Sequence, residues 1–228
     1  RILAGRYGKI KIENSAAISD AKIERLAHAL KEGAPIEGKP LETALYNIAA
    51  LGGIEAAGFL SPGTTFGTGD LTIRVKDGKR QSYVLYSENY GSEPSGRYRF
   101  GLQGSFENLT KSGDRLNLGR TLSNKDLHNY GISYSHPVGA DGTTLGIGVS
   151  RMDYELSGAF RTLGAEGTAD TLSLFGTTPL WRTAQSSLAV TYGWDWRRLK
   201  DEYKKIGMEL EKHSSTFHLG IKGAERQY

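Results

Sequence analysis

Cysteine is absent from this chain of 228 residues, and only 6 residues are proline and 2 are methionine. Without cysteine, the chain has no disulfide framework, no thiol catalysis and no cysteine-based zinc site. Long apolar runs are also missing, since none approaches the roughly 18 residues of a membrane-spanning helix. The formal net charge of +4 is small, so we do not expect nucleic acid as a partner.

Glycine and aromatic residues are plentiful, with 30 Gly, 12 Tyr, 7 Phe and 3 Trp. Together with strong apolar–polar alternation, this composition excludes a disordered chain and indicates a β-rich body with many turns. It is also the composition of a transmembrane β-barrel, whose strands are individually only half apolar. The chain opens at Arg1 without a basic or apolar leader and stops at Tyr228 directly after an alternating run. We therefore expect a fragment of a longer protein.

Residues 1–79 predict an α+β domain with the order β-α-α-β-β. Residues 7–13 alternate like a strand. Ser19 and Asp20 can cap a helix that Gly33 ends. The apolar face of this helix has i, i+3, i+4, i+7 spacing, with Ile23, Leu26, Ala27 and Leu30. Pro40 is placed to begin a second helix, which Gly52 and Gly53 end, and strands at residues 55–60 and 70–75 follow.

Residues 80–228 alternate apolar and polar side chains and predict an all-β antiparallel domain. We expect eight strands, at residues 80–91, 95–108, 114–123, 127–137, 142–156, 166–178, 183–200 and 208–222. Short connections at residues 111–113, 139–142 and 178–180 alternate with longer ones at residues 156–166 and 200–206. Two points stay open: the register of residues 80–89, where Tyr83 and Leu85 compete with Val84 and Tyr86, and Arg120, which interrupts an apolar row.

Alternation alone fits both a soluble sandwich or small barrel and a membrane barrel. The predicted strands are about 10–15 residues long, against about 5–6 in soluble sheets and about 9–11 needed to cross a bilayer. The polar face carries charges that suit a water-filled interior. Aromatic residues lie towards predicted strand ends, as an interfacial girdle requires, namely Tyr90, Tyr98, Tyr154, Trp181, Trp194, Trp196 and Tyr203. These features favour the membrane barrel.

Short motifs recur in a fixed order along both parts of the chain. The motifs YGKI (7–10), GKPLE (38–42), PGT (62–64) and GTGDL (67–71) are similar to the second POTRA (polypeptide-transport-associated) domain of one family, the two-partner secretion transporters of the haemolysin-activator and filamentous-haemagglutinin group. The motifs ENYGS (88–92), SGRYR (95–99), NLTKSGD (108–114) and YGISYSHPVG (130–139) are similar to the start of its barrel. The resemblance implies a POTRA domain at residues 1–79 and, at residues 80–228, the first half of an outer-membrane barrel of about sixteen strands.

The resemblance also implies transport of a protein rather than chemistry. The POTRA domain, in the periplasm, would capture an unfolded secreted exoprotein, here called the client, and the barrel would pass it across the bacterial outer membrane. The client would be haemolysin-like or adhesin-like, and the barrel's other partner is outer-membrane lipid. An assembly factor of the same superfamily, which inserts client barrels, is the nearest alternative. A passive porin is a further one, but it should lack the β-α-α-β-β unit.

An extended client can pair with a free sheet edge through its main chain. The predicted client-binding residues are those of the edge strand and a groove beside the first helix: Glu55, Ala56, Ala57, Gly58, Phe59, Leu60, Ile23, Ala27 and Leu30. The predicted pore-lining residues are Arg97, Arg99, Gln103, Glu107, Asp195, Arg197, His218 and Lys222.

We expect no catalytic residue, metal site, cofactor or nucleotide, and hence no enzyme. The five histidines, His28, His128, His136, His213 and His218, lack metal-ligand spacing. The glycines of residues 63–69 lead into a strand without a following lysine, so they do not form a phosphate-binding loop. No nucleophile elbow is present, and scattered Ser, His and Asp residues define no triad.

Overall fold

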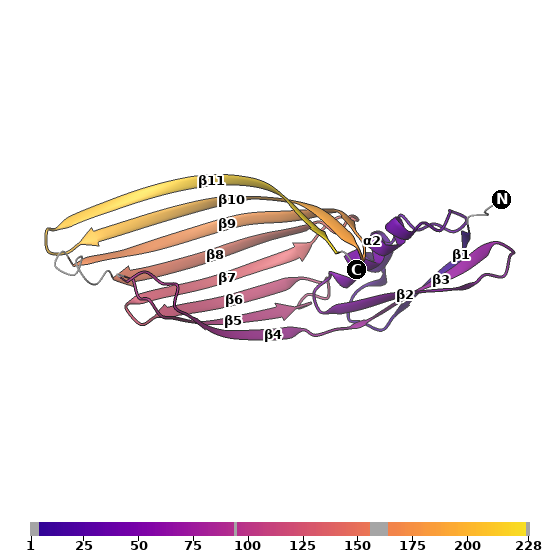
Figure 1. The fold of residues 1–228 in the computed structure, drawn as a ribbon, viewed down its shortest axis with the longest axis horizontal. Helices are drawn as coiled ribbons and strands as arrows, with labels where there is room; N and C mark the ends of the chain where they lie inside the picture. The colour runs from indigo at the N-terminus through magenta and orange to yellow at the C-terminus, as the bar shows by residue number, and fades with distance from the viewer. Residues whose placement is uncertain (1–4, 94, 156–163, 227–228) are drawn as a thin grey trace.

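The computed structural model describes residues 5–93, 95–155 and 164–226, which form two sheets arranged end to end (Figure 1). The first part, the α+β domain, contains β1 (Arg6–Asn14), α1 (Asp20–Leu26), α2 (Gly38–Ala49), β2 (Ile54–Pro62) and β3 (Thr68–Asp77). The predicted β-α-α-β-β order is confirmed. Its sheet has the order β1-β3-β2, with β1 parallel and β2 antiparallel to β3. No helix in the described residues is long and apolar enough to cross a membrane.

The core of the α+β domain lies between the two helices and one face of this sheet. Strand β3 is central and supplies Leu71, Ile73 and Val75, and the helices supply Ile23 and Ile48, all fully buried. Burial of a side chain of this size contributes about 1.5–3 kcal/mol. The alternating apolar residues of β3 and the apolar face of α1 therefore pack together in a single layer.

The first helix is shorter than predicted. Helix α1 ends at Leu26, and residues 27–29 form a turn instead of continuing to Gly33. The Ala27 N–H still bonds to the Ile23 carbonyl and the Leu30 N–H bonds to the Ala27 carbonyl, so a tighter turn closes the helix. Ser19 occupies the N-cap position, but its side chain makes no capping hydrogen bond.

The second part is one antiparallel sheet in which every strand pairs with its neighbour in sequence, in the order β11-β10-β9-β8-β7-β6-β5-β4. The strands are β4 (Gln81–Glu88), β5 (Arg99–Glu107), β6 (Arg115–Ser123), β7 (Leu127–Pro137), β8 (Thr144–Glu155), β9 (Ala165–Arg182), β10 (Ser186–Tyr203) and β11 (Met208–Glu225). All eight predicted strands are confirmed. The sheet curves without closing, because β4 and β11 do not pair with each other in the described residues (Figure 1).

Strands β9 and β11 are longer than predicted, at 18 residues each, and β10 has the predicted 18 residues but begins and ends three residues later. The turn predicted at residues 178–180 is wrong, because Pro179 lies inside β9. A register shift between Leu188 and Ala189 of β10 lies opposite this proline, and such an irregularity tolerates a residue without an N–H. Because β10 runs from Ser186 to Tyr203, Trp194 and Trp196 lie near its middle rather than at an end. The predicted long connection at residues 156–166 falls largely outside the described residues.

The sheet has one apolar face and one polar face, and pairing resolves the register of β4. Leu85 lies opposite Leu102, and Tyr86 lies opposite Gly101 on the other face, so Tyr83 and Leu85 belong to the apolar face. Arg120 lies between Leu102 of β5 and Tyr130 of β7. Arg120 therefore lies on the apolar face and interrupts the row of apolar side chains along β6.

Candidate functional site

Strand β2 is an edge of the α+β sheet, and its free side exposes main-chain groups. The Gly63 N–H bonds to the Thr68 carbonyl, and the Gly78 N–H bonds to the Gly53 carbonyl. Both bonds match the β2–β3 register, so odd-numbered residues of β2 direct their N–H and C=O groups to β3. Main-chain groups alternate along a strand. Ala56, Gly58 and Leu60 therefore direct theirs outwards, and no hydrogen bond joins these outward groups to another described segment.

The opposite edge, β1, is partly covered. The Tyr7 N–H bonds to the Ala34 carbonyl, the Gly33 N–H bonds to the Tyr7 carbonyl, and the Ile36 N–H bonds to the Gly5 carbonyl. Further along β1 the Glu32 carboxylate accepts the Ile10 N–H at 3.2 Å. The segment after α1 thus occupies positions along β1 at which an added strand would have to pair. Strand β2 is therefore the more open edge of this sheet.

Side chains of the predicted edge strand are largely exposed. Phe59 and Leu60 are 48% and 50% exposed, and Glu55 forms an ion pair with Lys76 at 2.9 Å. The guanidinium of Arg74 lies 4.8 Å from the centre of the Phe59 ring. An incoming strand would meet apolar and charged groups together at this edge.

The three predicted groove residues of the first helix region are packed inside the domain. Ile23 is 0%, Ala27 6% and Leu30 8% exposed, and all three belong to the core. They do not line an open groove in this structure, because α2 and the sheet cover them. The apolar spacing of this helix therefore marks core residues, and the predicted groove is not formed by them in this structure.

Most of the predicted pore-lining residues lie on the polar face of the large sheet, and two of them, Arg97 and Glu107, lie next to or at an end of β5. Arg99 forms an ion pair with Glu88 at 3.7 Å, and His218 lies 3.6 Å from Asp195. Gln103, Arg197 and Lys222 share this face. Glu107 is at the end of β5, where it accepts the Gly53 N–H at 2.6 Å, and Arg97 precedes β5. No three His, Asp or Glu side chains in the described ranges could hold a metal ion.

Helix α2 lies across three short turns of the large sheet. In the middle of the helix the Thr43 hydroxyl donates to the Arg182 carbonyl (3.1 Å), and near its end the Asn47 amide donates to the Asp141 carbonyl (3.0 Å). Just past its end the Gly52 N–H donates to the Gly113 carbonyl (2.9 Å). Along the chain the three contacts reach the turns in reverse order, from the β9–β10 connection to the β5–β6 turn. The segment from Thr43 to Gly52 therefore lies along the row of turns.

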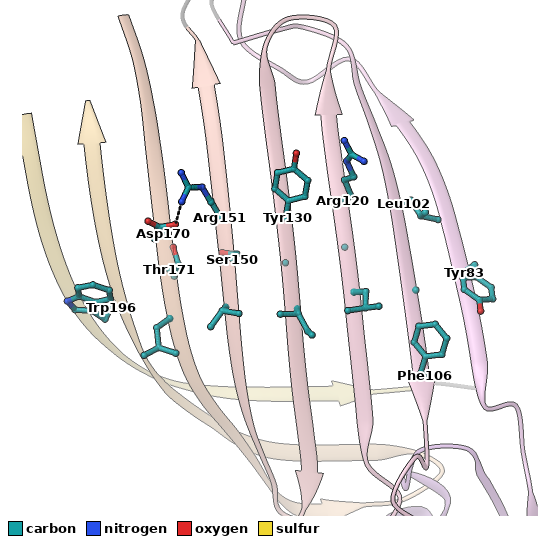
Figure 2. Close-up of a pocket in the computed structure, with 17 residues that line it drawn as sticks. Tyr83, Leu102, Phe106, Arg120, Tyr130, Ser150, Arg151, Asp170, Thr171 and Trp196 are labelled. Carbon is teal, nitrogen blue, oxygen red and sulfur yellow. Dashed lines mark ion pairs between the residues drawn. The ribbon is translucent and has the colours of Figure 1, made fainter. Parts of the chain in front are cut away.

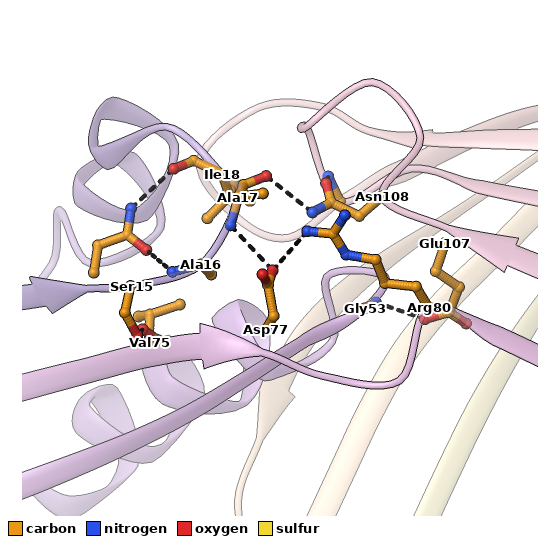
Figure 3. A network of polar contacts seen from close by, with 12 residues as sticks. Ser15, Ala16, Ala17, Ile18, Gly53, Val75, Asp77, Arg80, Glu107 and Asn108 are labelled. Atoms are coloured by element: carbon orange, nitrogen blue, oxygen red, sulfur yellow. Dashed lines mark hydrogen bonds and ion pairs between the residues drawn. The ribbon is translucent and has the colours of Figure 1, made fainter.

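A polar network holds the other side of this junction (Figure 3). Asp77, at the end of β3, accepts the Ala17 N–H at 3.0 Å and the Arg80 guanidinium at 2.8 Å. The Ala17 carbonyl in turn accepts the Asn108 amide at 3.0 Å. The Ala17 hydrogen bond and then Arg80 hold the pKa of Asp77 below its ordinary value of 3.8. The Asp77 carboxylate thus joins Ala17 to the linker at Arg80, and the Ala17 carbonyl joins this pair to the turn at Asn108.

The docking role of the turn at residues 108–114 is not visible in the sequence. Asp114 is fully buried and accepts hydrogen bonds from the Thr110 N–H and hydroxyl at 3.0 and 2.7 Å. Burial acts to raise the pKa of Asp114, but the Thr110 hydrogen bonds outweigh it and lower the pKa. A polar segment between two strands predicts a turn, but nothing local in the sequence shows that the turn docks on another domain.

A protein-family model described as "Haemolysin secretion/activation protein ShlB/FhaC/HecB" matches residues 67–226. This chain belongs to that family. The match includes the end of the α+β domain and the described strands of the large sheet. It confirms the resemblance to two-partner secretion transporters.

Known relatives agree with the ShlB/FhaC/HecB assignment. The heme/hemopexin transporter protein HuxB of Haemophilus influenzae is 28% identical over 225 residues, which are 98% of this chain and 40% of HuxB. The chain thus spans well under half the length of the curated relatives it matches. Among solved structures, CdiB from Escherichia coli superposes with a TM-score of 0.73 at 19% identity, covering 99% of this chain and 43% of CdiB.

Two further structures share the fold. CdiB from Acinetobacter baumannii superposes with a TM-score of 0.69 at 19% identity, covering 99% of this chain and 44% of that one. BamA from Haemophilus ducreyi lacking POTRA domains 1–3 superposes with a TM-score of 0.58 at 16% identity, covering 98% and 44%. The fold is therefore a POTRA domain followed by part of an outer-membrane barrel.

Membership of the ShlB/FhaC/HecB family places the large sheet in the outer membrane and the POTRA domain in the periplasm. The turns that contact α2 are consequently the periplasmic ends of the strands, and the opposite ends face outwards. The apolar face borders lipid, because a barrel in a membrane directs its apolar residues outwards and its polar residues inwards.

Proposed function

We propose that this chain captures an extended segment of a secreted exoprotein along the free edge of β2 and directs it into the barrel lumen. The observation that carries the proposal is the row of outward main-chain groups at Ala56, Gly58 and Leu60. Main-chain pairing at a sheet edge supplies affinity with little dependence on the client's sequence. Such tolerance suits a transporter of long unfolded chains.

The position of β2 supports delivery to the barrel. Ile54, the first residue of β2, pairs with Asp77, the last residue of β3, and β4 begins at Gln81. Next to Ile54, the Gly53 N–H bonds to Glu107 at the periplasmic end of β5. A client strand laid along β2 would therefore have one end at the rim of the barrel.

The polar face offers a hydrated path beyond that rim. Its side chains carry both signs of charge, with Arg99, Arg197 and Lys222 against Asp195 and Glu107. A mixed, water-exposed lining binds no single charge pattern strongly, so an extended chain could slide along it. We infer that these residues, with Gln103, His218 and Arg97, line the pore.

The relatives bear on the kind of client. HuxB is named as a heme/hemopexin transporter, and we propose for this chain a secreted exoprotein of the haemolysin or adhesin kind. The likeness to BamA concerns the fold and is weaker than the likeness to CdiB. Because the family match is to haemolysin secretion/activation proteins, secretion is favoured over assembly of client barrels.

The test is a substitution of Leu60 in the full transporter that contains this chain. Leu60→Pro removes one outward N–H but leaves the hydrogen bonds to β3, which odd-numbered residues make. Loss of one such bond is worth about 0.5–1.5 kcal/mol, so we expect client secretion to fall about two- to tenfold. Ala56→Pro should act in the same way, for the same reason.

Leu60→Ala is the matched control, because it shortens the side chain but keeps the N–H. Secretion is measured as client in the culture medium, with the amount of folded transporter in the outer membrane determined in parallel. Equal secretion by Leu60→Pro and the wild type, at equal transporter levels, would contradict capture along β2. Equal losses with Leu60→Ala and Leu60→Pro would assign the effect to the side chain instead.

A further inference from the structure

Arg120 is a cation on the lipid-facing side of the barrel wall. It shares its strand face with Leu116, Leu118 and Leu122, and an arginine on the lipid face is unfavourable, most at the bilayer midplane and less towards the interfaces. Such a residue marks a functional site by default and needs a partner. The guanidinium charge of Arg120 therefore needs an anion close by.

The protein supplies no carboxylate to Arg120 in the part of the chain that the structure describes. Other arginines on this face are paired: Arg151 with Asp153 at 2.9 Å and with Asp170 at 3.7 Å, and Arg198 with Glu211 at 2.5 Å. Arg120 instead lies with its guanidinium carbon 5.2 Å from the centre of the Tyr130 ring. That contact offsets part of the cost but leaves the positive charge without a counter-ion.

A shallow groove of about 760 Å³ adjoins Arg120 on the same face. Its walls are mainly apolar, with Leu102, Phe106, Leu118, Ile132, Leu172 and Trp196. In Figure 2 the polar ends of Arg120, Tyr130 and Arg151 point towards the strand ends away from the POTRA domain, which is the outer side of the membrane. The groove is therefore apolar towards the periplasm and polar towards the outside, where Arg120 lies beside the Arg151–Asp170 ion pair. An amphipathic molecule from the outer leaflet would require this arrangement.

We propose that this groove binds a phosphorylated glycolipid of the outer leaflet, with acyl chain on the apolar wall and phosphate on Arg120. In hydrocarbon the anions within reach of a lipid-facing guanidinium are lipid phosphates, and arginine binds phosphate through two parallel N–H groups. The outward direction of the three polar side chains selects the outer leaflet over the inner one. The inference rests on the membrane orientation of the sheet and not on client capture at β2.

The test measures lipid binding to the full transporter in detergent, by native mass spectrometry. The probes are a phosphorylated glycolipid, the same glycolipid after enzymatic dephosphorylation, and phosphatidylglycerol. One basic residue near a membrane surface contributes about 1 kcal/mol, so Arg120→Gln should weaken binding of the phosphorylated glycolipid about fivefold. Arg120→Lys should lose less, because it keeps the charge but not the paired N–H groups.

Lys212→Gln is the control, because Lys212 pairs with Leu199 on the opposite face of the sheet; its binding should equal that of the wild type. Unchanged binding in Arg120→Gln would overturn the proposal. So would equal binding of the phosphorylated and dephosphorylated glycolipids to the wild-type protein, a comparison that needs no variant to fold. Equal binding of phosphatidylglycerol, with equal sensitivity to Arg120→Gln, would overturn the choice of the outer leaflet.

Discussion

Asn108 joins the first periplasmic turn to the POTRA domain through both ends of its side-chain amide. The nitrogen donates to the Ala17 carbonyl at 3.0 Å, and the oxygen accepts the Gly113 N–H at 2.9 Å. Its backbone φ is 57°, in the left-handed region that asparagine tolerates better than most residues. One residue therefore both shapes the turn and docks it on the neighbouring domain.

We expect Asn108→Ala to destabilise the protein more than Asn108→Gly. Both variants lose the two hydrogen bonds. Alanine must in addition adopt the left-handed backbone conformation, which is unfavourable by roughly 1 kcal/mol or more for a residue with a Cβ atom. The difference should therefore be about 1 kcal/mol in the free energy of unfolding, measured by urea titration of the full transporter. Equal stability of the two variants would show that backbone strain plays no part, and a wild-type midpoint for both would show that the turn is not an anchor.

At the scale of the strand, aromatic rings cover glycines on neighbouring strands of the barrel wall. Tyr86 of β4 lies opposite Gly101 of β5, and its hydroxyl is 2.8 Å from the Thr121 hydroxyl of β6. A Cβ atom at Gly101 would come within 2.1 Å of the Tyr86 ring. The glycine thus makes room for a ring that links three strands.

Gly101→Val should displace Tyr86, break its contact with Thr121 and destabilise the barrel by about 1–3 kcal/mol. Gly119→Val is the control, because a Cβ at Gly119 would meet no atom within 4 Å. The measurement is the temperature at which the folded barrel is lost in detergent. A similar shift in both variants would contradict the packing argument and indicate a general cost of valine.

The two faces of the sheet give a second prediction at this scale. Spin labels at Leu102, Val190 and Leu219 should be accessible to oxygen, which concentrates in lipid. Labels at Gln103, Thr191 and Lys222 should instead be accessible to a water-soluble nickel chelate. These two sets alternate along β5, β10 and β11, and a barrel in a membrane is apolar outside and polar inside. The reverse pattern in the reconstituted transporter would contradict the membrane orientation.

At the scale of the whole molecule, the POTRA domain and the barrel are joined by a row of specific contacts. Helix α2 spans the three short turns, and Asp77 links Ala17 to Arg80 on the other side. These contacts hold β2 at the periplasmic rim (Figure 1). The client delivery that we propose would need such a fixed relation between β2 and the pore.

The junction should loosen in acid. Because the pKa of Asp77 is lowered by Ala17 and Arg80, its contribution to stability is present above pH 3.8 and is lost as the pH falls through the lower pKa of the folded protein. Spin labels at Ala21 and Leu109 should show one narrow distance at neutral pH and a broad one below that range. Asp77→Asn should be broadened already at neutral pH and change less on acidification; a distance insensitive to both would contradict the role of Asp77.

Much of this architecture is readable from side-chain periodicity. The alternation in β5, β8 and β10 predicted strands, faces and antiparallel order, because each strand carries its own two-residue period. The predictions were wrong where contacts with other elements of the fold set strand length or burial. Pro179 looked like a turn but lies in β9, which runs on to Arg182. Trp194 and Trp196 looked terminal but lie mid-strand, because β10 runs from Ser186 to Tyr203. Ile23, Ala27 and Leu30 looked like a groove, but the domain core covers them.

Local spacing and motif order are enough to identify the family, the β-α-α-β-β unit and the two-faced strands. Which sheet edge is open depends instead on the fold, since the cover over β1 comes from the segment after α1. The fold also places α2 and Gly52 on three turns, and Arg120 beside an apolar groove without a carboxylate partner in the described residues. These are relations between residues far apart in the chain, and a one-dimensional pattern contains no distances between them.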